Sequence, residues 1–173
     1  MKKIIFTSLF LFASNLSAND ISFFGIDLNI NKSSVEINKE TKSDKFNSFG
    51  LKLGYMSNER RHYISYAKRL DYDNINYTDV LYNYDLFLKR FNKFTPYIGV
   101  HAGLGILQYN NQEQLTFDYG VKAGLLHDFM YNSHLDFGLK YSNTNSVYIG
   151  DRKLNDNLSL YLGYTFGFDN LLY

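Results

Sequence analysis

The chain has 173 residues, with 18 lysines and arginines against 17 acidic residues, one proline and no cysteine. This length suits a single domain. The balanced charge excludes the strong attraction to nucleic acid that a basic protein would have, and the lack of cysteine excludes disulfides and thiolate metal sites.

The first 18 residues have the pattern of a secretory signal peptide. Lys2 and Lys3 precede the apolar run "IIFTSLFLFA", and Ala18 is a small residue suited to cleavage. The run is shorter than the ~20 residues that a membrane-spanning helix needs. We therefore expect residues 1–18 to direct export by the Sec pathway and residues 19–173 to form one barrel domain. Loss of the two lysines changes the formal charge from +1 to −1.

Eight segments of this domain alternate large apolar residues with small or polar ones, which is the period of a β-strand. The predicted strands span residues 21–30, 47–57, 62–70, 81–90, 95–107, 115–126, 134–142 and 157–168. In the last strand the apolar set is Leu158, Leu160, Leu162, Tyr164, Phe166 and Phe168. The only proline, Pro96, falls at the first residues of a strand, where a missing N–H is tolerated.

The apolar face of these strands is too bulky to point inward. An eight-stranded barrel has an interior only just wide enough for side chains, whereas many of the residues on this face are Phe or Tyr. Turned outward, they form the apolar belt of a membrane barrel, with polar residues in the lumen. The pattern therefore predicts an all-β fold, an eight-stranded antiparallel up-and-down transmembrane β-barrel.

The inward face then carries a nearly balanced set of charges, which we expect to pair across the lumen as a structural network. The bases are Lys52, Arg69, Lys89, Lys122 and Lys140; the acids are Asp27, Asp85, Asp118 and Asp136; His101 is a hydrogen-bonded neighbour. Unpaired buried charges are costly, so pairing and trapped water should keep the lumen closed. Replacing Arg69 by alanine is expected to loosen this plug and to raise conductance.

The connections after the first, third, fifth and seventh predicted strands are longer than those after the second and fourth, as expected for extracellular loops opposite periplasmic turns. The first and fourth carry Lys32, Lys39, Lys42, Lys45, Arg152 and Lys153, which could pair with lipopolysaccharide phosphates. The acids Glu36, Glu40, Asp44 and Asp151 are interspersed among them, which favours an ordinary solvated loop. In the second long loop, Asp71, Asp73 and Asp79 suit either a solvated turn or a divalent cation, and we expect no metal site.

The segments "YNYDLFLKRFNKFTPYIGVHAGLGI", "DYGVKAGLLHDF" and "LYLGYTFGF" resemble the outer membrane β-barrel domain family, small porin-like proteins related in form to OmpA and OmpX. The resemblance covers essentially all of residues 19–173 and implies a monomer without cofactor in a Gram-negative outer membrane. Its implied partners are outer membrane lipids, lipopolysaccharide and the assembly machinery, which reads an aromatic residue ending the last strand. Phe168 fits that role, although "DNLLY" follows and Tyr173 is the alternative.

One enzymatic motif competes with this interpretation. The stretch "KYSNTNS", residues 140–146, is similar to the His-x-Ser-Asn stretch of lipid A deacylases, but Lys140 stands where the histidine should be. A serine nucleophile needs an adjacent base, and both Ser142 and Lys140 point into the predicted lumen.

The sequence therefore favours a non-enzymatic barrel that contributes to envelope integrity and displays surface loops for binding or adhesion. The alternatives are a lipid A or phospholipid hydrolase and a narrow porin-like channel.

Overall fold

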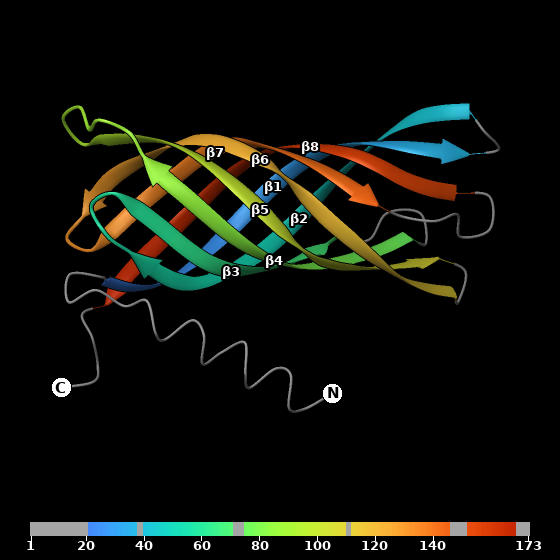
Figure 1. Cartoon of the computed structure of the whole chain (residues 1–173), viewed down its shortest axis with the longest axis horizontal. Helices are drawn as coiled ribbons and strands as arrows, with labels where there is room; N and C mark the ends of the chain where they lie inside the picture. The colour runs from blue at the N-terminus through green and yellow to red at the C-terminus, as the bar shows by residue number, and fades with distance from the viewer. Residues whose placement is uncertain (1–20, 38–39, 71–74, 110–111, 146–151, 169–173) are drawn as a thin grey trace.

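The structure is a computed structural model that describes residues 21–37, 40–70, 75–109, 112–145 and 152–168. Eight antiparallel strands close into one barrel (Figure 1). They are β1 (Ile21–Ile37), β2 (Glu40–Met56), β3 (Arg60–Arg69), β4 (Ile75–Phe87), β5 (Phe94–Tyr109), β6 (Gln112–Met130), β7 (Ser133–Asn145) and β8 (Arg152–Phe168). Within these ranges there is no helix of the length and apolarity needed to cross a membrane.

Each strand pairs with the next along the chain, and β1 closes the barrel by pairing with β8. Leu28 of β1, for example, lies opposite both Phe49 of β2 and Leu162 of β8. Closure gives every strand a neighbour on both sides, so that the wall has no free edge through its middle. The predicted eight-stranded up-and-down barrel is confirmed.

The strands are longer than predicted at the end where the sequence predicts long connections, which we call the loop end (right in Figure 1). Two of those connections are in fact short, because only residues 38–39 separate β1 from β2 and only residues 110–111 separate β5 from β6. β1 continues past residue 30, and β2 begins before residue 47. The two strands stay paired in register over this extension, with Ser34 opposite Ser43. Lys32, Lys42 and Lys45 therefore lie in strands and not in a loop, which corrects the prediction. The prediction ended each strand where apolar alternation stopped, but a backbone ladder needs no apolar side chains.

The barrel wall exposes apolar side chains and buries polar ones. Outward residues of the middle of the wall are about half exposed, as with Leu53 (59%) and Leu104 (51%). The lumen holds fully buried Lys52, Arg61 and Asp136. This arrangement is the inverse of a water-soluble protein and is typical of barrels whose outer face contacts lipid.

Two apolar clusters lie inside the barrel towards its ends. The turn-end cluster comprises Phe23, Met56, Tyr63 and Leu126, with Phe87 packed against it. The loop-end cluster comprises Val35, Tyr77, Leu107 and Leu154, with Tyr109 packed against it. Because β1 and β8 lie across the barrel from β4 and β5, the loop-end cluster bridges opposite walls. The polar lumen is thus packed between two apolar layers.

Candidate functional site: an ion-pair network in the lumen

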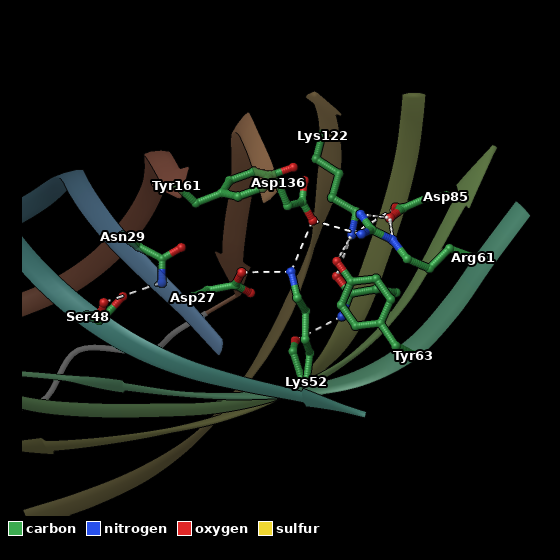
Figure 2. Close-up of polar contacts among 12 residues, drawn as sticks. Asp27, Asn29, Ser48, Lys52, Arg61, Tyr63, Asp85, Lys122, Asp136 and Tyr161 are labelled. Carbon is green, nitrogen blue, oxygen red and sulfur yellow. Dashed lines mark hydrogen bonds and ion pairs between the residues drawn. The ribbon is translucent and has the colours of Figure 1, made fainter. Parts of the chain in front are cut away.

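Six charged side chains form a continuous chain across the lumen (Figure 2). We call Asp27, Lys52, Asp136, Arg61, Asp85 and Lys122, in that order, the lumen network. Its successive ion pairs have N···O distances of 2.8, 3.0, 2.8, 2.7 and 2.8 Å. The charges alternate in sign and come from β1, β2, β7, β3, β4 and β6. Three cations thus balance three carboxylates, and each inner member has a partner on both sides.

Tyrosines complete the coordination of these charges. Tyr97 donates a hydrogen bond to Asp136 Oδ1 at 2.5 Å, and its hydroxyl also contacts that of Tyr161. The Arg61 guanidinium lies 5.1 Å from the Tyr63 ring centroid and 4.9 Å from that of Tyr97. Aromatic faces attract cations most strongly where water is excluded. The two rings therefore add to the stabilisation that the buried guanidinium receives from its ion pairs.

Glycines let charges on non-adjacent strands meet. Gly99 of β5 lies between Asp85 of β4 and Lys122 of β6 in the register. A Cβ at Gly99 would collide with the Asp85 carboxylate and stand 2.7 Å from the Tyr84 carbonyl oxygen. Without a side chain at this position, the Asp85 and Lys122 side chains reach each other over the strand between them. Glycine at this inward position of β5 is thus explained by packing, because the two charged side chains occupy the space that a side chain on β5 would fill.

The structure brings together five of the charged residues predicted to face the lumen, namely Asp27, Lys52, Asp85, Lys122 and Asp136. Arg69 is buried nearer the loop end, where it pairs with Asp44 at 2.7 Å and stacks over Phe46. The inward placement of Lys89 is wrong. β4 ends at Phe87, so Lys89 lies beyond the strand with an exposed side chain.

Sequence reasoning missed Arg61, the cation at the centre of the network. The predicted third strand begins at residue 62, so the prediction places Arg61 in the preceding turn. In the structure β3 starts at Arg60, and Arg61 is fully buried. The signal was present, because Arg61 shares the odd parity of the inward residues Ser65 and Arg69.

A second group of polar residues lies further towards the loop end. We call His101, Asp118, Lys140 and Ser142 the upper lumen group. His101 Nε2 and Ser142 Oγ are hydrogen-bonded at 2.9 Å across Gly120, which separates them in the register. Asp118 accepts a hydrogen bond from Tyr77. Lys140 has no carboxylate within 4.0 Å in the described part of the chain. This group has hydrogen bonds but no ion pairs of the kind found in the lumen network.

Metal binding finds no support among the described residues, where no three His, Asp or Glu side chains are grouped to hold an ion. Asp79, one of three aspartates considered for a cation, lies in β4 and is buried, whereas Asp71 and Asp73 fall outside the described residues. The expectation of no metal and no cofactor stays a prediction.

Of the six cationic residues considered for lipopolysaccharide, Lys32 and Lys45 lie directly opposite each other with exposed side chains. Lys42 is exposed and lies 3.9 Å from Glu40. Lys153 is half-buried in β8, opposite Glu36. Lys39 and the side chain of Arg152 lie outside the described part of the chain, as do Tyr173 and the predicted signal peptide.

Solved structures with similar folds are small membrane barrels, although no protein-family model and no curated protein sequence matches the chain. Neisserial surface protein A superposes with a TM-score of 0.68 at 16% identity, over 88% of this chain and 98% of that one. Outer membrane protein H of P. aeruginosa gives 0.62 at 22% identity, over 86% and 99%. The N-terminal β-barrel domain of Pseudomonas aeruginosa OprF gives 0.53 at 16% identity, over 83% and 97%. The chain therefore has the fold of the small eight-stranded outer membrane β-barrels.

Proposed function

We propose that the protein is a non-enzymatic outer membrane barrel with a closed lumen, which contributes to envelope integrity and presents its loop end to the cell exterior. The observation that carries this proposal is the lumen network, whose six charges cross a barrel that is apolar on its outside. For water to pass through the lumen, the partners of these ion pairs would have to separate.

The energetic argument rests on burial. Lys52, Arg61, Asp85 and Asp136 have fully buried side chains. Removing one partner of such a pair costs about 3–5 kcal/mol, because it leaves an uncompensated charge. The two apolar clusters lie at either end of the lumen network, so that they block the same path along the barrel axis. The ion pairs and the two apolar clusters together support a closed lumen, which argues against the narrow-channel alternative.

The outer surface supports contact with lipid phosphates. Like charges directly opposite on neighbouring strands destabilise a sheet, yet Lys32 and Lys45 occupy such positions, without a salt bridge to any described residue. They lie just beyond Ile30, the last apolar outward residue of β1. Phosphate oxygens of lipopolysaccharide at this level would accept charge-assisted hydrogen bonds from both ammonium groups.

Export and assembly complete the proposal. The predicted signal peptide would direct the chain through the Sec pathway, and the assembly machinery would read the last strand. Phe168 closes β8 and lies opposite Ser22 of β1, where an aromatic signal would also form part of the barrel seam. A monomer is sufficient for this role, since the barrel closes on itself.

The closed-barrel proposal predicts heat-modifiable gel mobility of the detergent-extracted protein and no solute flux in liposome swelling. The assay would compare liposomes containing this protein with liposomes containing a sixteen-stranded porin. Swelling with sugars at rates near those of the porin would overturn the proposal. Recovery of a folded, water-soluble monomer without detergent would also overturn it.

Lysine variants test the phosphate contact. The double substitution Lys32→Gln and Lys45→Gln should reduce co-purifying lipopolysaccharide, measured as organic phosphate per barrel. Lys42→Gln is the matched control, since Lys42 is also exposed but has Glu40 beside it. Equal phosphate in the double variant and the control would contradict this part of the proposal.

A hydrolase is the second candidate, because the hydrogen bond between His101 and Ser142 supplies the base that the sequence motif lacked. Three observations weigh against it. Ser142 and His101 are only 5% and 3% exposed. His101 Nδ1 has no hydrogen-bond partner in the described part of the chain, so no third group orients the base. Both residues lie inside the barrel. Turnover of lipopolysaccharide by the purified barrel that is lost in Ser142→Ala would revive the hydrolase.

A further inference from the structure

A polar groove of about 540 Å³ lies on the outer wall at the loop end, where β6, β7 and β8 adjoin. Its lining is rich in amides, with Asn143 and Asn145 from β7, Asn155 and Asp156 from β8, and Tyr119 from β6. Lys153 also lines it. The volume falls in the range of about 300–1,000 Å³ that is typical of small-molecule sites.

A β-bulge builds this groove. The register between β8 and β1 shifts where Asn157 lies opposite Ser33 and Leu154 lies opposite Val35. Two residues of β8, Asn155 and Asp156, thus occupy the space opposite Ser34 alone. A bulge re-aims side chains and is frequent beside binding sites. Here it sets two successive polar residues on the same wall as Asn143, which alternation already directs outward.

The hydrogen-bonding groups of the groove are both donors and acceptors. Asn143 Nδ2 donates to Asp156 Oδ1 at 2.7 Å, which fixes the two side chains relative to each other. The side chains of Asn145, Asn155 and Lys153 make no hydrogen bond to another described residue. An amide offers two donors and a carbonyl acceptor, an ammonium only donors and a carboxylate only acceptors. A ligand rich in hydroxyl groups, which both donate and accept, matches such a lining.

Charge and shape narrow the class of ligand further. The formal charges of Lys153 and Asp156 cancel, so the groove selects neither an anion nor a cation. Tyr119 is 48% exposed and lies against Phe117, with ring centroids 6.0 Å apart. An exposed aromatic ring presents a flat apolar surface beside polar groups. A sugar ring complements such a surface, because it has an apolar C–H face that can lie on the aromatic ring and a rim of hydroxyl groups that can bind the polar side chains.

We infer that this groove binds a neutral saccharide unit. Below it the wall returns to apolar residues such as Tyr141 and Leu158, so the groove lies at the outer boundary of the apolar belt. A sugar could reach this level either as part of a membrane-anchored glycolipid or as a free glycan. Both sources share the same chemistry. The inference does not depend on the lumen being closed.

Two binding measurements on the full mature barrel separate the sources. The first probes an array of neutral oligosaccharides with detergent-solubilised protein. The second compares the thermal shift of the barrel in nanodiscs containing lipid A with that in nanodiscs containing lipopolysaccharide that carries core sugars. Saturable binding on the array identifies a free glycan as ligand. A stabilisation that requires the core sugars, without binding on the array, identifies the anchored glycolipid.

Matched asparagine variants test the location. Asn145→Ala and Asn155→Ala should each weaken binding at least tenfold. Asn47→Ala, an exposed outward asparagine of β2 on another part of the wall, should leave it unchanged. Heat-modifiable mobility shows that each variant still forms the barrel. No saturable binding in either measurement, or equal binding by all three folded variants, would overturn the inference while leaving the proposed function intact.

Discussion

The two polar layers of the lumen are filled in different ways. In the lumen network, buried cations and carboxylates alternate at 2.7–3.0 Å, and each inner charge has two partners. In the upper lumen group, His101 binds Ser142, Asp118 binds Tyr77, and Lys140 has no carboxylate of the described residues within 4.0 Å. Buried charges couple strongly where they are paired and desolvated. We therefore expect the resistance of the barrel to unfolding and to water to be concentrated in the lumen network.

The largest expected effect is that of Asp136→Ala. Asp136 Oδ2 is shared by Lys52 and Arg61, and its removal leaves two buried cations without their common partner. Unfolding in urea, followed in detergent micelles, should show a loss of about 3–5 kcal/mol in the free energy of unfolding. A loss below about 1 kcal/mol would mean that the network carries little of the stability.

The glycine that permits the network predicts the next largest effect. Gly99→Ala inserts a methyl group between the Asp85 carboxylate and the Tyr84 carbonyl. The carbonyl belongs to the backbone of a paired strand, so it cannot move away without distorting the sheet. Overpacking of this kind costs about 1–3 kcal/mol. Gly50→Ala is the control, because its nearest atom would be the Tyr66 carbonyl oxygen at 3.4 Å. Equal unfolding free energies for the two variants would contradict the close-approach argument.

A smaller effect is expected in the upper lumen group. Asp118→Ala removes the acceptor of the Tyr77 hydroxyl without breaking an ion pair between described residues. The loss should be about 1.5 kcal/mol, the lower end of the range for a hydrogen bond to a charged group. Urea unfolding in the same micelles allows direct comparison with Asp136→Ala. A loss as large as that of Asp136→Ala would remove the distinction between the two layers.

The strand count, the inward face and the closed topology could be predicted because alternation survives wherever a wall separates lipid from a packed lumen. Five charges of the network were predictable from parity alone. Their partners were not, because contacts such as Lys52 with Asp136 join strands that are not neighbours. Those contacts depend on barrel closure and on glycine gaps between the strands.

The errors arose at strand ends, where alternation fades. Arg61 was excluded and Lys89 was included because the limits of β3 and β4 were misplaced by a few residues. At the loop end, polar residues such as Ser34 and Ser43 continue the ladder without an apolar signature. The groove beside β8 depends on a bulge that shifts the register between Ser33 and Val35, and no sequence pattern indicated that shift.

The smallest effect is expected for conductance in Arg69→Ala, which revises the expectation from sequence. Arg69 pairs with Asp44 and stacks on Phe46 near the loop end, with its guanidinium carbon 4.1 Å from the ring centroid, so the lumen network remains intact without it. Planar-bilayer recordings should therefore show no conductance beyond that of the unmodified barrel.

Arg61→Ala is the matched arginine variant, and it breaks the chain of charges between Asp136 and Asp85. It should admit water and produce intermittent openings. Larger openings in Arg69→Ala than in Arg61→Ala would place the barrier of the lumen at the loop end and contradict the comparison between the two layers.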